Sequence, residues 1–145
     1  MNGLIVIKVV LDTNVYISGI LFNGPPREVI SVAIRGAIAV YISPAILDEC
    51  KEVLGREKFG FTPARISVIA GEIESITTLV VPGKHYSVVS RDSDDNIIID
   101  CAIESKAEFI VTGDNDLLSM GRYRHIAIVS PTAFLEHYSS RHVSE

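Results

Sequence analysis

The chain has 145 residues, of which 48% are hydrophobic and 21% are charged, and its formal net charge at pH 7 is −5. This balance is typical of one globular domain and excludes an intrinsically disordered chain. The negative charge disfavours a domain that coats nucleic acid by overall attraction. It does not exclude a nuclease, because a metal-loaded acidic pocket with cations beside it still attracts phosphate. We expect a single domain over residues 1–145.

The sequence carries no pattern typical of a membrane span, an export leader or a zinc site. Its apolar runs are too short to cross a bilayer. The first run, residues 4–11, contains Lys8 and leads into Asp12 without a small-residue cleavage site, unlike a signal peptide. We interpret it as a strand and expect a cytoplasmic protein without a membrane partner. Cys50 and Cys101 lack metal-ligand spacing, so buried thiols are expected.

Strand and helix patterns alternate along the chain, which is typical of a mainly parallel sheet covered by helices. The strand candidates are residues 5–11, 38–42, 78–82, 108–112 and 126–129. Between the first two, Pro25 and Pro26 begin a helical pattern that stops at Gly36, as prolines and glycines commonly do at the two ends of a helix. The alternation predicts an α/β fold.

A second helix is expected to begin at Ser43 and Pro44, because serine is a favoured N-cap and proline suits the first helical position. Apolar residues recur at helical spacing after it. Glu49 lies among them, on or beside the inward face. A polar, glycine-bearing break at residues 55–62 is the segment that we expect to be most mobile, and a further helix is expected at residues 63–76.

An irregular pattern at residues 82–93 leads into a run of acidic residues. Aspartates at a helix start commonly cap the helix or interact with its dipole. We favour that interpretation for Asp92 and Asp94, while a contribution of either to a metal site stays open.

Asp95 differs from these neighbours because it shares a helical face with apolar residues. It precedes Ile98 by three residues and Ala102 by seven, so the helix should turn it inward. Asp100 lies about 140° around the helix from Asp95. We expect Asp100 to be exposed or to support a ligand from outside, and its contribution to the site stays open.

Four carboxylates can therefore meet at one edge of the sheet. Asp12 and Asp114 each follow a β-branched strand, and ligands of open α/β sheets bind at that edge. Glu49 and Asp95 can point toward it from helices. At about 4 Å and an effective dielectric near 20, each like-charge pair costs on the order of 4 kcal/mol, so protons or a cation must neutralise some of them. Oxygen ligands alone suit Mg²⁺ or Mn²⁺.

Four motifs in this order resemble those of PIN-domain ribonucleases, over nearly the whole chain. They are VLDTN at residues 10–14, SPAILDE at 43–49, DSDDN at 92–96 and IVTGDNDLL at 110–118. Within that superfamily the chain is most similar to the toxin components of toxin–antitoxin systems, the VapC-like toxins. The segment IVSPTAFL at residues 128–135 also fits that group.

The resemblance implies a three-layer α/β/α sandwich with a mainly parallel central sheet, and it assigns roles to the acidic residues. The implied catalytic and metal-binding residues are Asp12, Glu49, Asp95 and Asp114. The implied supporting residues are Asn14 and Thr112, which would orient the first acid and its surroundings, and Asp116, an auxiliary carboxylate. The implied cofactor is Mg²⁺ or Mn²⁺.

The resemblance also implies the activity, a metal-dependent endoribonuclease that hydrolyses RNA phosphodiester bonds. A toxin of this kind would pair with a small antitoxin protein, and such toxins often form homodimers. Cations considered for phosphate contacts are Arg27, Arg56, Lys58, Arg91 and Arg122, although each alone is more often a solvated surface charge. The four histidines show no ligand spacing.

Three alternatives stay open. The protein could be a PIN nuclease that is not a toxin, or a catalytically silent RNA-binding or assembly module, which would be expected to lack some of the acids. A Mg-dependent phosphotransfer domain is the third alternative. One type expects a second aspartate two residues after the first, where this chain has Asn14. The receiver type expects an aspartate at the end of the third strand and a lysine near the fourth, and neither is apparent.

Overall fold

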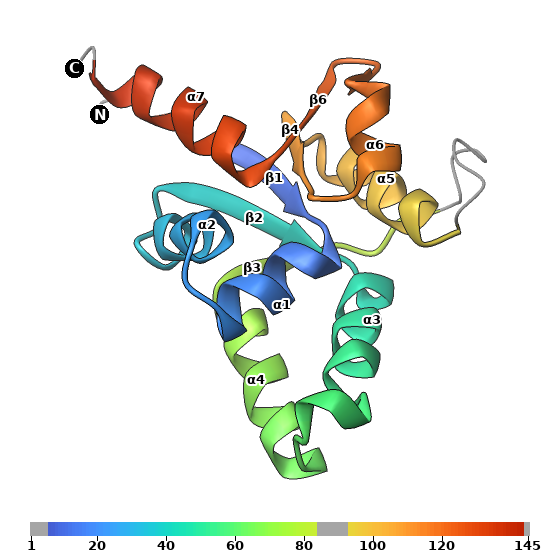
Figure 1. Cartoon of the computed structure of the whole chain (residues 1–145). Helices are drawn as coiled ribbons and strands as arrows, with labels where there is room; N and C mark the ends of the chain where they lie inside the picture. Colours follow the sequence, from blue (N-terminus) through green and yellow to red (C-terminus); the bar gives the residue numbers. More distant parts are fainter. Residues whose placement is uncertain (1–5, 84–92, 144–145) are drawn as a thin grey trace.

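One sheet with the strand order β3-β2-β1-β4-β6-β5 forms the centre of the molecule (Figure 1). The computed structural model describes residues 6–83 and 93–143. Its strands are β1 (Ile7–Leu11), β2 (Ile38–Ile42), β3 (Thr77–Leu79), β4 (Phe109–Val111), β5 (Arg122–Tyr123) and β6 (Ile126–Val129). Neighbouring strands are parallel, except that β5 pairs with β6 in the antiparallel sense. The predicted mainly parallel sheet is confirmed.

Helices flank this sheet. They are α1 (Thr13–Leu21), α2 (Pro25–Ile34), α3 (Pro44–Leu54), α4 (Pro63–Ser75), α5 (Ser93–Ser105), α6 (Asn115–Met120) and α7 (Pro131–Val143), with a 3₁₀ turn, η1 (Glu57–Phe59), between α3 and α4. The chain crosses the sheet in one direction from β1 to β3 and then returns through α5 to β4. Since parallel crossovers are right-handed, this reversal places α5 on the face opposite α1 to α4. The three-layer α/β/α arrangement follows.

The central strands are buried along their length. Val9, Val10 and Leu11 of β1, like Ile110 and Val111 of β4, have no exposed surface. A strand covered on both faces has a continuous apolar sequence rather than an alternating one. The same apolar runs that predict β1 and β4 therefore also bury them in the core.

The helix α1 is not among the elements that the sequence pattern predicts, nor are α6, β5 and α7. Val15, Tyr16 and Ile17 are all buried, so α1 lacks the polar face that gives a surface helix its period. It packs closely on α2. A side-chain carbon added at Gly19 would lie 2.7 Å from Cγ1 of Ile30, so glycine is required for this approach.

The expected bounds of β3 are wrong at its C-terminal end. The prediction was residues 78–82, whereas the strand is Thr77–Leu79. The N–H of Val80 still donates to the carbonyl of Ile42 at 2.8 Å, but β2 ends at that residue. Because β2 offers no backbone groups beyond Ile42, its pairing with β3 stops there.

Two other expectations have different outcomes. The expected mobility of residues 55–62 stays a prediction, and this segment contains the η1 turn. The irregular stretch at residues 82–93 lies mostly outside the described residues, as do Asp92 and Arg91. Among the described helices, none is both long enough and apolar enough to cross a membrane.

Candidate active site

Two aspartates meet where the neighbouring strands β1 and β4 end. The strands are parallel and in register, with Leu11 opposite Val111. The N–H of Asp12 donates to the carbonyl of Val111 at 2.9 Å, which continues the ladder one step beyond β1. Asp114 follows β4 by three residues. The sheet itself therefore brings the first and last predicted acids to a common edge.

The hydroxyl of Thr112 links these two acids. It donates to Oδ2 of Asp12 at 2.7 Å and accepts the backbone N–H of Asp114 at 2.9 Å. Thr112 has no exposed surface, so water does not compete for either bond. One buried side chain fixes both the Asp12 carboxylate and the backbone that carries Asp114.

Glu49 reaches the same edge from α3. This helix begins directly after β2, where the Ser43 hydroxyl caps it by accepting the N–H of Ile46 at 3.2 Å. The hydroxyl of Thr13, the first residue of α1, donates to Oε1 of Glu49. This bond joins α3 to the residue that follows Asp12.

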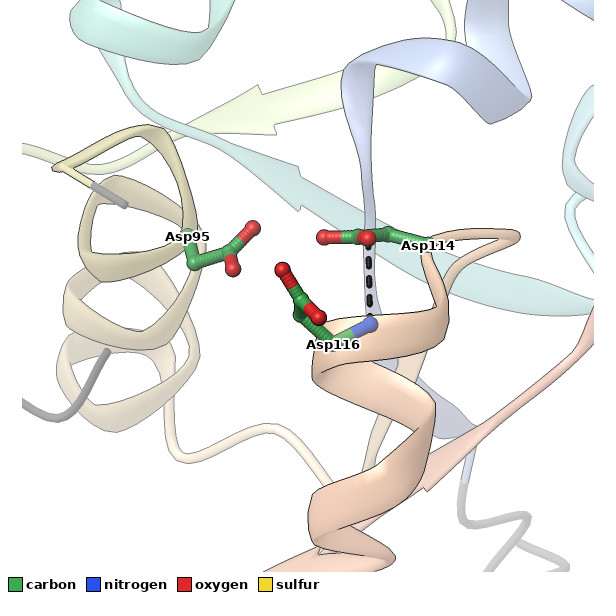
Figure 2. Close-up of side chains that lie close together, drawn as sticks. All are labelled: Asp95, Asp114 and Asp116. Atoms are coloured by element: carbon green, nitrogen blue, oxygen red, sulfur yellow. Dashed lines mark hydrogen bonds between the residues drawn. The ribbon is translucent and has the colours of Figure 1, made fainter. Parts of the chain in front are cut away.

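Asp95 comes from α5, which packs on β1, β2 and β4. This residue is only 4% exposed, which confirms the predicted inward orientation. Carboxylate oxygens of Asp95, Asp114 and Asp116 all lie within 4.8 Å of one another. Figure 2 shows the three side chains converging from α5 and from the start of α6, where Oδ1 of Asp114 accepts the N–H of Asp116 at 3.1 Å.

A polar cleft of about 300 Å³ opens between these elements. Its lining residues are Asp12, Thr13, Asn14, Glu49, Val53, Arg56, Asp94, Asp95 and Asp114. All four acids implied by the resemblance are thus brought together in one cavity. Asn14 lines the cleft too, but among the described residues no side-chain hydrogen bond joins it to Asp12, and its orienting role stays a prediction.

Two carboxyl groups of the cleft, those of Asp12 and Glu49, resist ionisation. Burial raises the pKa of Asp12, and the charges of Asp114 and Asp94 add to this, while hydrogen bonds from Thr112 and from the N–H of Thr13 oppose it. Burial and the neighbours Asp94 and Asp12 raise the pKa of Glu49 to about 7, although the Thr13 hydroxyl acts in the opposite direction. A cation in the cleft would replace the protons that otherwise relieve this repulsion.

The donor set fits a hard divalent cation. The acids that line the cleft offer carboxylate oxygens as ligands, and Mg²⁺ and Mn²⁺ prefer oxygen ligands. Cys50 is buried, and burial raises its pKa to about 12, so it offers no thiolate nearby. Cys101 is likewise a buried free thiol, and the prediction for both cysteines is confirmed.

Sequence reasoning missed one neighbour of the site, favoured a capping role for a second and left two alternatives open for a third residue. No role was predicted for Thr13. Had α1 been recognised, the position of Thr13 directly after Asp12 would have indicated that it lies at the site. Asp94, interpreted as a helix cap, lines the cleft. Of the two alternatives for Asp100, exposure is wrong, because this residue is 4% exposed, while a supporting role stays a prediction. The middle of α5 is buried on several sides, so a residue on a different face of this helix from Asp95 can also be buried.

Comparisons with known proteins agree with this geometry. Residues 8–116 match the family model described as PIN domain. The chain is also 35% identical over 150 residues to the uncharacterized protein MJ1680 of Methanocaldococcus jannaschii, with 91% of this chain and 92% of that protein covered. PIN domains are generally nucleases that bind divalent metals and act on RNA. The family match spans well over half of the sequence, and the chain belongs to the PIN domain family.

Proposed function

We propose that this protein is a Mg²⁺- or Mn²⁺-dependent endoribonuclease that hydrolyses RNA phosphodiester bonds in the acidic cleft. The observation that carries the proposal is the convergence of Asp12, Glu49, Asp95 and Asp114, from four separate segments, on one cavity. A silent RNA-binding module has no need for so costly a concentration of like charges.

Each part of the cleft has a role in this proposal. The four acids hold the cation, with Asp116 as an auxiliary carboxylate beside Asp95 and Asp114. Thr112 orients Asp12, and Asn14, which lines the cleft, helps to orient the surroundings of this acid. The cation would activate a water molecule and stabilise the charge that develops at phosphorus. No protein side chain is required as the nucleophile.

The resemblance to VapC-like toxins supports a further part of the proposal, in which the nuclease is the toxin of a toxin–antitoxin pair. It would act in the cytoplasm as a single domain, bind a small antitoxin protein and form a homodimer. An antitoxin that inserts a basic side chain into the acidic cleft would be electrostatically complementary.

The test of the nuclease is cleavage of a panel of structured and single-stranded RNAs with Mn²⁺, Mg²⁺ or EDTA. Asp12→Asn and Asp95→Asn should abolish cleavage that the unaltered protein performs with metal. Asp48→Asn, an exposed change one residue before Glu49, is the matched control and should leave cleavage intact. Residual cutting in the Asp12 and Asp95 variants would indicate a contaminating enzyme.

The toxin role has a separate test. Induced expression in a bacterial host should arrest growth with the unaltered protein and not with Asp12→Asn. Cleavage of RNA in vitro without growth arrest would identify a PIN nuclease that is not a toxin. Metal binding without cleavage of any RNA would instead favour the binding or assembly module.

A further inference from the structure

Arg56 is the one basic residue among the described residues that lines the acidic cleft. Arg91 lies outside the described residues, and the three other cations considered from the sequence are placed elsewhere. The guanidinium of Arg27 donates to the carbonyls of Gly19 and Ile20, at 3.0 and 2.8 Å, and so caps the end of α1. The ammonium of Lys58 lies 5.1 Å from the ring centre of Phe59. Arg122 belongs to β5, away from the cleft lining.

The position of Arg56 follows from α3. Glu49, Val53 and Arg56 all line the cleft and are spaced by four and three residues, so they form one stripe along the helix and its C-terminal end. The backbone of Arg56 is held on both sides. Its N–H donates to the carbonyl of Val53 at 3.1 Å, and its carbonyl accepts the N–H of Phe59 at 3.0 Å. The guanidinium therefore extends from a fixed point at the rim of the cleft.

Arg56 is an exposed residue whose guanidinium has no partner among the described residues. Across residues 6–83 and 93–143, its side chain makes no hydrogen bond or ion pair, although five carboxylates line the same cavity. By contrast, Arg141 pairs with Glu108 at 3.2 Å. A planar guanidinium group without a partner, beside a candidate metal site, is suited to bind the non-bridging oxygens of a phosphate in a bidentate manner.

We propose that Arg56 contacts an RNA backbone phosphate at the rim of the cleft and so places the strand against the metal-binding acids; this inference rests on the proposed function. An RNA strand brings its own negative charge to a cavity lined by carboxylates. The Arg56 cation, just past the C-terminal end of α3, offsets the part of that repulsion which the metal does not cancel. Phosphates carry no base identity, so Arg56 contributes to affinity and not to the choice of cleavage sequence.

The test compares Arg56→Gln with Lys58→Gln, which removes the same charge two residues away and outside the cleft lining. Both are assayed on a fluorescein-labelled single-stranded RNA with Mn²⁺, over a series of KCl concentrations. We expect Arg56→Gln to raise KM by roughly 10- to 100-fold, the range for losing a hydrogen bond between charged groups, with a smaller change in kcat. Lys58→Gln should stay within about twofold of the unaltered protein.

The salt series separates a phosphate contact from a structural role. Each phosphate contact to a single strand adds about 0.7 to the slope of log affinity against log salt, so Arg56→Gln should lower the slope by about that amount. Arg56→Lys should keep the slope because it keeps the charge, while recovering only part of the affinity. Stabilisation by Mn²⁺ in thermal unfolding should be retained in all variants, which shows that the fold and the acids are intact.

The outcomes distinguish this inference from the proposed function. If the unaltered protein cleaves RNA while Arg56→Gln and Lys58→Gln share the same KM and salt slope, the Arg56 contact is overturned and the nuclease stands. If the unaltered protein does not cleave, the nuclease fails, and binding of the same RNA with Mn²⁺ decides on Arg56. Loss of binding confined to Arg56→Gln then supports the contact, whereas equal binding in both variants, or none by the unaltered protein, overturns it.

Discussion

The two walls of the acidic cleft are built differently. The first wall consists of Asp12 and Glu49, whose carboxylates accept hydrogen bonds from the hydroxyls of Thr112 and Thr13. The second wall consists of Asp95 and Asp114, which lie at the starts of α5 and α6, with Asp116 close beside them. The first wall is fixed by side chains that the sheet and α1 hold in place. On the second wall, Oδ1 of Asp114 accepts the backbone N–H of Asp116 at the start of α6.

This difference indicates how the site is organised before a cation arrives. Hydroxyl donors hold Asp12 and Glu49 in place even where burial and neighbouring charge raise the pKa of each. Asp116 is exposed and Asp114 is half-buried, so solvent relieves part of the repulsion on their side. We infer that the first wall is preorganised, and that Asp114 and Asp116 adjust more readily to the ion.

The largest effect is expected at the acids themselves. Asp12→Asn and Asp95→Asn, one on each wall, should each lower kcat/KM for RNA cleavage by more than about 100-fold, beyond the 10- to 100-fold typical of residues that only orient a ligand. The reason is the loss of a charged oxygen ligand from the cavity. Mn²⁺ titration beside the cleavage assay checks this, and a loss on one wall only would show that the other does not take part.

Thr112→Val should come next, with a loss of about 10- to 100-fold in metal affinity or activity. The change removes the donor to Asp12 and leaves the part-buried N–H of Asp114 without its acceptor, which also costs about 1 kcal/mol of stability. Thr112→Ser keeps the hydroxyl and serves as the control. Equal metal affinity in the valine and serine variants would mean that the first wall is not held by this hydroxyl.

The pH dependence of stability tests the raised pKa values on the first wall. The pKa of Glu49 rises from 4.5 to about 7 on folding, so the folded metal-free protein binds more protons than the unfolded chain between these values. The contribution of Glu49 to the free energy of unfolding should therefore be fully present below about pH 4.5 and be lost as pH rises through 7. Because Glu49 is partly exposed, screening limits this to about 1 kcal/mol, or roughly 2–4 °C in Tm.

Thermal unfolding in EDTA between pH 5 and pH 8 measures this decline. Glu49→Gln should flatten it, whereas Glu52→Gln, an exposed change on the same helix, should not. Mn²⁺ should raise Tm more at pH 8 than at pH 5, because the ion needs deprotonated carboxylates. The raised pKa of Glu49 would be contradicted if, without metal, the unaltered protein gained Tm relative to Glu49→Gln between pH 5 and pH 8.

The smallest effect is expected for Asp116→Asn, with a loss of only a few-fold, below the roughly 10- to 100-fold typical of residues that orient a ligand. The asparagine keeps the backbone N–H that Asp114 accepts, and the exposed position tolerates the change. Kinetics with Mn²⁺ compare it with Asp95→Asn. Equal losses in the two variants would make Asp116 a ligand of the same rank and remove the distinction within the second wall.

The sequence predicts the site more completely than it predicts the elements that carry it. Asp12 and Asp114 are visible because each follows a buried apolar strand, and Asp95 because it shares a face with Ile98 and Ala102. The pattern misses α1, since a helix buried on nearly every side has no polar stripe, and with it the contact from Thr13 to Glu49. The burial of Asp100 is missed for the same reason.

By itself, the sequence determined the α/β alternation, the positions of Asp12 and Asp114 after buried strands, and the chemistry of the acids, because apolar periodicity and residue type are local properties of the chain. The tertiary structure alone decided which carboxylates share a cavity and which hydroxyls hold them. It also placed Arg56 at the rim while directing Arg27 to the end of α1. Those outcomes depend on how separate helices and strands pack, and no local pattern records the distance between residues that lie far apart in the chain.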